Sequence, residues 1–206
     1  VMVTARKNIY HPIREYLNGV EWDRSPRVDS WLHRYCGVVD DKYTRFVART
    51  ALLSAVYRVF KPGCQYDTMI ILEGDQGIGK SRLVRALGGE WYKAISLLGH
   101  DHNTVQLMRS SWFVEVPELS VFAKRDIESL RAFISNPVDA ARFAYARNDE
   151  VIPRQSVFIG TINPDSNGYL MDATGNRRFL PVFLKHVDVD GIIKERDLLF
   201  AEAVHL

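Results

Sequence analysis

The strongest constraint on the fold of this 206-residue chain is a glycine-rich loop that follows a short apolar run. The loop, Gly74 to Ser81, matches the pattern G-x-x-x-x-G-K-[ST], and Met69–Leu72 before it has the composition of a buried strand. Arg82–Leu87 after it favours a helix that ends at Gly88-Gly89. This strand–loop–helix order predicts a phosphate-binding loop within an α/β domain.

Each residue type in this loop suits one part of a nucleoside triphosphate. Glycines let backbone N–H groups converge on the phosphates, a lysine reaches the β- and γ-phosphate oxygens, and a hydroxyl contacts Mg²⁺. We therefore expect ATP and Mg²⁺, with Lys80 in a catalytic role and Ser81 at the metal. The residues expected to bind the nucleotide are Gly74, Asp75, Gln76, Gly77, Ile78, Gly79, Lys80, Ser81 and Arg82. The alternative is an accidental glycine-rich turn, which the flanking strand and helix disfavour.

The spacing of hydrophobic residues predicts that the chain consists of a helical part followed by an α/β part. Before residue 64, apolar residues recur at three- and four-residue steps between capping signals, which favours a helical subdomain over residues 1–64. After it, Trp112–Val116 and Val157–Ile162 are short, mostly apolar runs separated by amphipathic stretches, which is typical of parallel strands buried on both faces. We predict an α/β P-loop NTPase core over residues 65–206, with Pro62-Gly63 near the boundary.

Composition excludes several classes of protein. The net charge is only +2, so any nucleic-acid site must be local. No apolar run approaches the roughly 18–20 residues of a membrane helix, and the N-terminus has no signal-peptide pattern, so we expect a soluble cytoplasmic protein. Cys36 and Cys64 lie in no Cys/His cluster and are expected to be buried free thiols. The start at Val1 and the helical pattern up to Leu206 suggest a domain excised from a longer polypeptide.

Two acids near the end of the second apolar run are candidates for ATP hydrolysis. Hydrolysis requires one carboxylate near the Mg²⁺ shell and another that orients or deprotonates the attacking water. Glu115 interrupts the run, where a buried carboxylate is costly unless it serves a metal or a charged neighbour, and Glu118 follows Pro117. We predict that both acids act at the metal and in catalysis. The alternative is that Glu115 pairs with a buried arginine while Glu118 caps the next segment.

Three polar residues further along are candidates for the γ-phosphate. Asn163 ends the third apolar run and could sense the γ-phosphate or the attacking water, although Asn-Pro-Asp is also a turn signal. Arg177 and Arg178 follow a Gly-Asn turn, and an arginine so placed can stabilise the charge that develops on a transferred phosphoryl group. A solvated basic turn would have the same sequence.

Together these motifs resemble the virulence-associated protein E family, a group of phage- and mobile-element-encoded ATPases similar to superfamily-three helicases of the AAA+ class. The resemblance implies that Glu115 and Glu118 form the acidic metal motif, Asn163 the polar sensor, and Arg177 or Arg178 the arginine finger. The segments that carry it are His11–Leu17, Glu21–Asp23, Pro62–Cys64, Leu72–Ser81, Phe133–Ser135, Ile159–Thr161, Gly175–Phe179 and Ala201–Ala203.

One departure from that pattern affects the roles of the acids. AAA+ proteins commonly have two adjacent acids, whereas Val116 and Pro117 separate Glu115 from Glu118 here. We prefer Glu118 as the water-activating residue because it lies beyond the strand end, and Glu115 as a residue of the magnesium shell.

The resemblance also implies a hairpin, between the acidic motif and the sensor, that touches single-stranded DNA in the pore of a ring. Residues 142–147 alternate, Asn148-Asp149 is a turn pair, and residues 151–157 are again β-prone. Arginines can hold phosphates and a tyrosine can stack on a base, so the candidate contacts are Arg142, Tyr145, Arg147 and Arg154. The alternative is an ordinary exposed hairpin with solvated charges.

These observations favour the ATPase motor of a phage or mobile-element replication protein, a ring-forming DNA helicase or translocase. The resemblance implies a homo-oligomer, expected to be a hexamer, with single-stranded DNA and a primase domain or protein as partners. The alternative is an ATP-gated DNA-binding or regulatory assembly module with slow hydrolysis and no unwinding.

Overall fold

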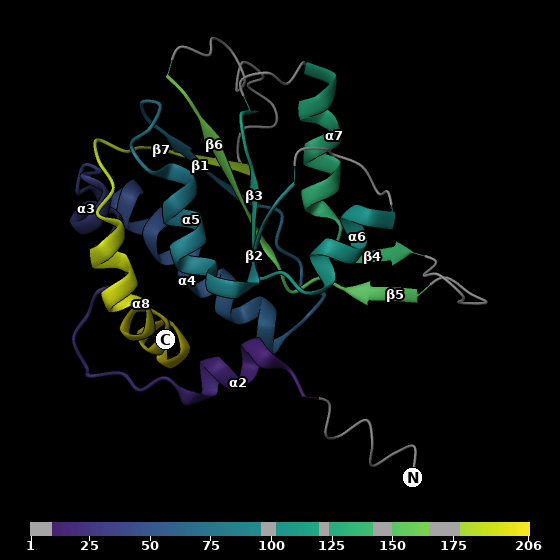
Figure 1. Cartoon of the computed structure of the whole chain (residues 1–206), viewed down its shortest axis with the longest axis horizontal. Helices are drawn as coiled ribbons and strands as arrows, with labels where there is room; N and C mark the ends of the chain where they lie inside the picture. The colour runs from purple at the N-terminus through teal and green to yellow at the C-terminus, as the bar shows by residue number, and fades with distance from the viewer. Residues whose placement is uncertain (1–9, 96–101, 120–123, 142–149, 165–177) are drawn as a thin grey trace.

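A parallel β-sheet with helices packed on its faces forms the centre of the molecule (Figure 1). The structure, a computed structural model, describes residues 10–95, 102–119, 124–141, 150–164 and 178–206. The helices are α2 (Pro12–Gly19), α3 (Trp31–Cys36), α4 (Lys42–Phe60), α5 (Lys80–Gly88), the 3₁₀ helix η1 (Gly89–Trp91), α6 (His102–Arg109), α7 (Lys124–Ser135) and α8 (Val189–His205). The strands are β1 (Met69–Glu73), β2 (Tyr92–Ala94), β3 (Phe113–Val116), β4 (Val138–Ala141), β5 (Glu150–Pro153), β6 (Val157–Ile162) and β7 (Phe179–Phe183).

Within these residues, five strands form the main sheet in the order β2-β3-β6-β1-β7, and all neighbouring strands are parallel. Strands β4 and β5 form a separate antiparallel pair. This arrangement confirms the predicted α/β fold with a hairpin insertion. Because the strands are parallel, β1, β3 and β6 end at the same edge of the sheet, and the segments that follow them meet there.

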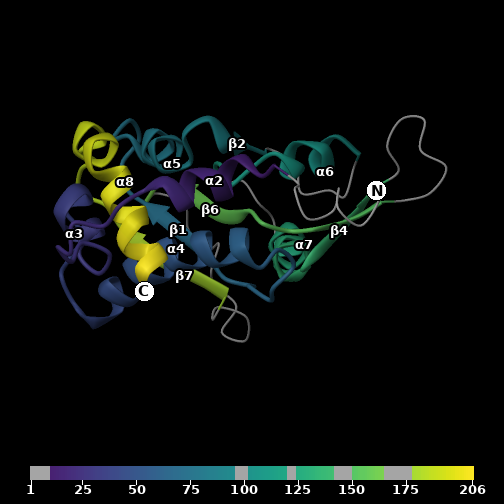
Figure 2. The ribbon, with the colours of Figure 1, turned by 90° about the horizontal axis from the view of Figure 1, so that it is seen from below.

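Side-chain alternation along the strands divides the core into two clusters. On β1, Ile70 and Leu72 pack into the cluster that contains α4, α5 and α8, whereas Met69 and Ile71 pack into the cluster that contains α7. Figures 1 and 2 show α5 and α8 on one side of the strands and α7 on the other. The first cluster combines residues from both sides of the boundary predicted near residue 64, and that division stays a prediction.

Local signals in the sequence account for several element ends. Asp41 and Thr44 form a reciprocal capping box at the start of α4, with Thr44 N donating to Asp41 Oδ1 at 2.8 Å. Helix α3 ends at Gly37, which has the left-handed conformation common for a glycine after a helix end. Cys36 and Cys64 are free thiols; Cys36 is buried and Cys64 is half-buried.

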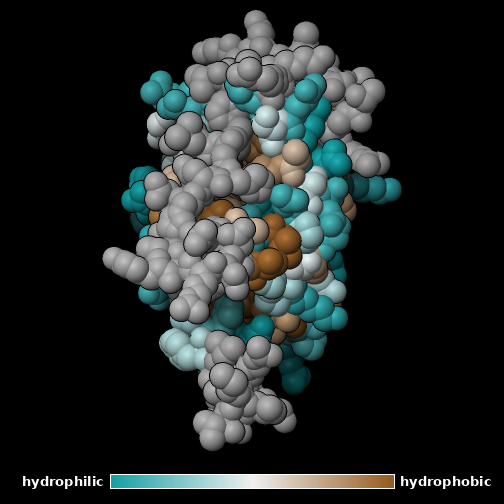
Figure 3. All heavy atoms as spheres, turned by 90° about the vertical axis from the view of Figure 1, so that its right-hand side faces the viewer, coloured by the Kyte–Doolittle hydropathy of each residue, from teal (hydrophilic) through white to brown (hydrophobic). Residues whose placement is uncertain are grey.

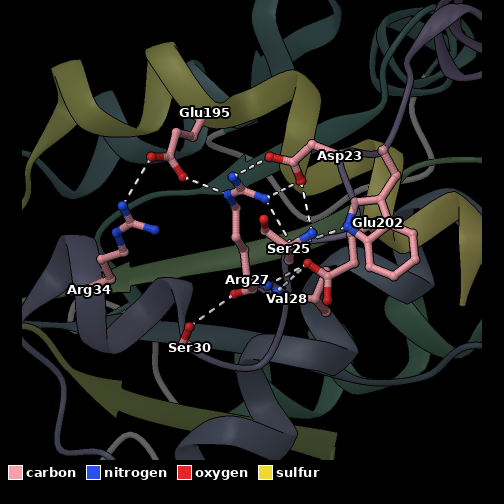
Figure 4. Close-up of polar contacts among 9 residues, drawn as sticks. Asp23, Ser25, Arg27, Val28, Ser30, Arg34, Glu195 and Glu202 are labelled. Carbon is pink, nitrogen blue, oxygen red and sulfur yellow. Dashed lines mark hydrogen bonds and ion pairs between the residues drawn. The ribbon is translucent and has the colours of Figure 1, made fainter.

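An ionic network fastens the segment before α3 to α8 (Figure 4). Arg27 Nε donates to Glu195 Oε2 at 2.9 Å, and its Nη1 donates to Asp23 Oδ1 at 2.7 Å. The Arg27 guanidinium lowers the pKa of Asp23 to about 2. Buried Glu202 accepts the backbone N–H of Val28 at 3.0 Å. These contacts hold the N-terminal segment along α8, on the side of the sheet that carries α5.

Trp112 joins three elements in the larger cluster. Its side chain is fully buried, its indole Nε1 donates to Ala55 O of α4 at 2.9 Å, and its ring centroid lies 4.5 Å from that of Phe200 of α8. We expect Trp112→Ala to lower the free energy of unfolding by about 3–5 kcal/mol because it leaves a cavity and an unpaired carbonyl. Urea denaturation would measure this. Leu107→Ala, at a side chain that is 42% exposed, is the control and should cost less than about 0.5 kcal/mol; equal losses would contradict the packing role.

Candidate nucleotide-binding site

The glycine-rich loop connects β1 to α5 at the carboxyl edge of the sheet. Gly77 and Gly79 have φ angles of 86° and 104°, in a region that side-chain-bearing residues rarely adopt. Gly79 is also the residue that caps α5, which begins at Lys80. The free N–H groups and the positive end of the helix dipole therefore lie at the loop, as an anionic phosphate requires.

A cavity of about 330 Å³ lies against this loop. It is bounded by residues from three segments that follow neighbouring strands, so the expected convergence at the sheet edge is present. The lining residues are Gln76, Gly77, Gly79, Lys80, Ser81, Arg82, Pro117, Glu118, Thr161, Ile162 and Asn163.

Lys80 links the loop to the end of β6. Its side chain is 8% exposed, and its ammonium donates to the carbonyl oxygens of Gly74 and Asp75, the latter at 2.8 Å. It also donates to Asn163 Oδ1 at 3.0 Å. Burial lowers the pKa of Lys80, while the charge of Asp75 opposes that shift. The structure thus brings two of the predicted residues, Lys80 and Asn163, into direct contact within the cavity.

Glu115 is the buried acid of the site. Its side chain is 1% exposed, and Oε1 accepts from Ser81 Oγ at 2.6 Å and from Thr161 Oγ1 at 3.0 Å. The Tyr92 hydroxyl donates to Oε2, and burial followed by this hydrogen bond raises the pKa of Tyr92 to about 12. All three donors are neutral hydroxyls. Among the described contacts Glu115 has no arginine partner, so the alternative of a buried ion pair is not supported.

Thr161 and Tyr92 are site residues that sequence reasoning missed. Thr161 had a usable signal, because it is a hydroxyl near the carboxyl end of the strand that neighbours β3. Tyr92 begins the short strand β2, which pairs with β3 so that Ala94 lies beside Glu115. Nothing in the local sequence indicated that pairing.

Glu118 lies past the end of β3 and faces the same cavity. It is exposed, and its φ angle is 52°, a left-handed conformation that costs a non-glycine residue about 1–2 kcal/mol. Strained backbone of this kind is concentrated at functional sites, where surrounding structure holds it in place. The two predicted acids therefore occupy different environments, one buried among hydroxyls and the other exposed at the cavity.

The structure corrects one predicted nucleic-acid contact. Arg154 is 2% exposed, and its guanidinium is paired with Asp139, so the prediction that this side chain contacts DNA is wrong. The pattern that suggested the contact places Arg154 after β5, but the side chain turns inward to a buried carboxylate. The described strands of the pair are Val138–Ala141 and Glu150–Pro153, and the predicted strand over 142–147 lies outside the described residues. The other predicted contacts, Arg142, Tyr145 and Arg147, lie outside the described residues.

The predicted arginine finger is described only at Arg178. This residue immediately precedes β7, whose first residue, Phe179, is level with Met69 at the start of β1. Arg178 therefore lies at the edge of the sheet opposite the glycine-rich loop, where its Nε is 3.4 Å from Asp67 Oδ2. Arg177 lies outside the described residues. Whether either arginine contacts a phosphoryl group stays a prediction.

Two further properties concern metal ligands and membrane spans in the part of the chain that the structure describes. No group of three or more His, Cys, Asp and Glu side chains is arranged to hold a metal ion there. A single acid such as Glu115 suits Mg²⁺, which usually binds one or two carboxylates together with substrate phosphates. In the same residues, no helix has the length and apolar character needed to cross a bilayer.

The parallel sheet, the glycine-rich loop after β1 and the acid on β3, two strands away, define an α/β fold of the P-loop type. The profile of the virulence-associated protein E-like domain matches residues 17–206, and the chain belongs to this family. No curated protein matches the sequence.

Solved structures share this fold at low sequence identity. An apo structure of the NrS-1 C-terminal region superposes with a TM-score of 0.63 at 15% identity, covering 92% of this chain and 48% of that one. A second apo structure, of NrS-1 residues 305–718, gives a TM-score of 0.64 at 15% identity, with coverages of 92% and 47%. The chain spans about half the length of these structures.

Proposed function

We propose that this domain is the Mg²⁺-dependent ATPase motor of a phage or mobile-element replication protein and works as a ring-forming DNA helicase or translocase. The observation that carries the proposal is the meeting of Lys80 and Ser81, at the start of α5, with Glu115 and Asn163 from neighbouring strands. ATP hydrolysis needs four groups at one point: a cation for the phosphates, a hydroxyl and a carboxylate for Mg²⁺, and a polar side chain beside the γ-phosphate. These four side chains provide them.

The contacts of Lys80 support the binding of a triphosphate. The Lys80 ammonium donates to two carbonyl oxygens of its own loop. We propose that these carbonyls occupy the positions that the β- and γ-phosphate oxygens take when ATP is bound. The phosphates of ATP, which carry more negative charge than carbonyls, would replace them at the same nitrogen. Asn163, already bonded to Lys80, would then lie beside the γ-phosphate.

The surroundings of Glu115 fit a magnesium ion. Glu115 is buried, and its three hydrogen-bond donors are neutral hydroxyls, so none of these contacts brings a positive charge to the carboxylate. A metal ion would supply that charge, since buried carboxylates are normally paired with cations or bound to metals. Ser81 and Glu115 would hold Mg²⁺, which would neutralise charge on the β- and γ-phosphates. Glu118, exposed at the cavity, would orient and deprotonate the water that attacks the γ-phosphorus in line with the leaving oxygen.

The position of Arg178 supports assembly. Because Arg178 lies at the opposite edge of the sheet from its own loop, it cannot reach the nucleotide bound to the same chain. In a ring, this edge of one copy could approach the nucleotide of the next, so that hydrolysis requires neighbouring subunits. We propose a hexamer that acts on single-stranded DNA in the bacterial or phage-infected cytoplasm, alongside a primase domain or protein.

The ATPase rate with and without single-stranded DNA tests this function. We expect Mg²⁺-dependent hydrolysis that single-stranded DNA accelerates several-fold, because a motor couples hydrolysis to movement along its track. Phosphate release would be followed at saturating ATP, with and without an oligothymidine and with EDTA as the metal control. ATP binding with slow hydrolysis that no DNA changes would contradict the motor and favour the ATP-gated assembly module.

A further inference from the structure

A buried ion pair lies at the base of the β4–β5 hairpin. Asp139 on β4 and Arg154 just after β5 are 3% and 2% exposed, and they form two hydrogen bonds at 2.6 and 2.7 Å. The Arg154 guanidinium also donates to Phe133 O near the end of α7 and lies 5.5 Å from the ring centroid of Phe158 on β6. One side chain thus contacts the hairpin, α7 and β6.

The three residues that connect β5 to β6 are each held by contacts outside the hairpin. Gly63 N donates to Arg154 O at 2.8 Å, and Arg58 Nη1 donates to Ser156 O at 2.9 Å. The Gln155 amide bonds to His11 and donates to Arg109 O at 3.2 Å. A connection anchored at every residue absorbs little motion, so a displacement of β6 would move the base of the hairpin with it.

Strand β6 carries site residues at its other end. Thr161 donates to Glu115, and Asn163, just past the strand, accepts from Lys80. The strand spans residues 157–162 and is buried throughout. Strand β6 therefore runs from the base of the hairpin to the side chains that we propose to lie beside the γ-phosphate.

We propose that the Asp139–Arg154 pair is a positioning joint that fastens the β4–β5 hairpin to β6 and α7, so that the nucleotide state at Asn163 is transmitted to the hairpin. The inference rests on the proposed function. A bidentate Arg–carboxylate pair fixes both the distance and the orientation of its two side chains. A buried pair of this kind often adds little to the free energy of unfolding, so its main effect is on the geometry of the elements that it joins. Arg154 thereby contributes to coupling from inside the protein, without touching DNA.

The hairpin is accessible to measurement because parts of it face solvent. Val138 on β4 and Val151 on β5 are 38% and 65% exposed. Figure 3, which views the molecule from the right-hand side of Figure 1, shows apolar side chains gathered among hydrophilic ones on this face. Substitutions at the exposed positions can therefore serve as matched controls in the same two strands.

The test compares the wild-type protein with the double variant Asp139→Leu/Arg154→Met by hydrogen exchange. Replacing both partners by apolar residues avoids a stranded buried charge and keeps the fold, whereas a single replacement could unfold it. In the wild type, a non-hydrolysable ATP analogue with Mg²⁺ should change the exchange rates of the β4 and β5 amides. In the double variant that change should shrink by about five-fold or more, the lower end of typical coupling factors, while analogue affinity stays within about two-fold. Val151→Thr, on the exposed face, should respond like the wild type.

Two outcomes would overturn the joint. One is a double variant that keeps the full nucleotide-dependent change in β4 and β5; the other is a wild type that binds the analogue without any change there. The failure of the proposed function has a different signature, which is absent ATP binding or hydrolysis in the wild type itself. As a second readout, the double variant should keep the basal ATPase rate and lose the acceleration by single-stranded DNA, which a purely structural pair would not cause.

Discussion

Replacing Glu118 by glutamine is expected to leave ATP binding nearly unchanged and to slow hydrolysis by about 10²–10⁴-fold, the contribution of a general base. Glu118 faces the cavity from an exposed, left-handed position beyond β3, where a water could lie between its carboxylate and the γ-phosphate. Glutamine keeps the size and the hydrogen bonds but cannot accept a proton. The measurement is the single-turnover hydrolysis rate beside the analogue Kd.

Glu115→Gln is the comparison that assigns the two acids. This change should weaken the binding of Mg²⁺, so that hydrolysis needs a higher Mg²⁺ concentration, because Glu115 is the acid that contacts Ser81. Glu90→Gln, an acid-to-amide change at an exposed residue of η1, is the matched control. It should leave the single-turnover hydrolysis rate and the analogue Kd unchanged. If Glu115→Gln binds Mg²⁺-ATP normally and only fails to hydrolyse it, the roles of the two acids are reversed.

Lys80→Ala should abolish tight ATP binding and reduce hydrolysis by at least about 10²-fold, the loss typical of one charge-stabilising donor. The variant removes the ammonium from the loop carbonyls and from Asn163. Fluorescent-nucleotide titration and phosphate release would measure the two effects. The free energy of unfolding should change little, because desolvation already disfavours this charge.

The control for this change is Lys194→Ala, at an exposed lysine of α8 that does not line the cavity at the loop. It removes the same charge from the protein and should bind and hydrolyse ATP like the wild type. Tight ATP binding by Lys80→Ala would show that the glycine-rich loop does not hold the phosphates.

The features predictable from the sequence are those that depend on local chemistry. The glycines of the loop, the apolar runs of β1, β3 and β6, and the Asp41 cap each have a signal within a few residues, and the structure contains all of them. The convergence of Glu115 and Asn163 on the loop could also be predicted, because parallel strands end at one edge. Their functional roles remain proposals.

The features that could not be predicted depend on partners distant in the sequence. Arg154 is an arginine in a β-prone stretch, as expected of a DNA contact, yet it forms a buried ion pair with Asp139 on the other strand of the hairpin. Tyr92 reaches Glu115 only because β2 pairs with β3, and the position of Arg178 follows from the pairing of β7 with β1. Local propensity carries no information on such pairings, so tertiary structure decides the environment of each side chain.

The most direct test of the nucleotide site is an experimental structure with Mg²⁺ and a non-hydrolysable ATP analogue. We predict the triphosphate in the cavity between the loop and Glu118, with Lys80 Nζ moved from the carbonyls of Gly74 and Asp75 to the β- and γ-phosphate oxygens. Ser81 and Glu115 should flank the magnesium ion, and Asn163 should face the γ-phosphate. An analogue bound elsewhere, with Lys80 still bonded to its own loop, would contradict the account.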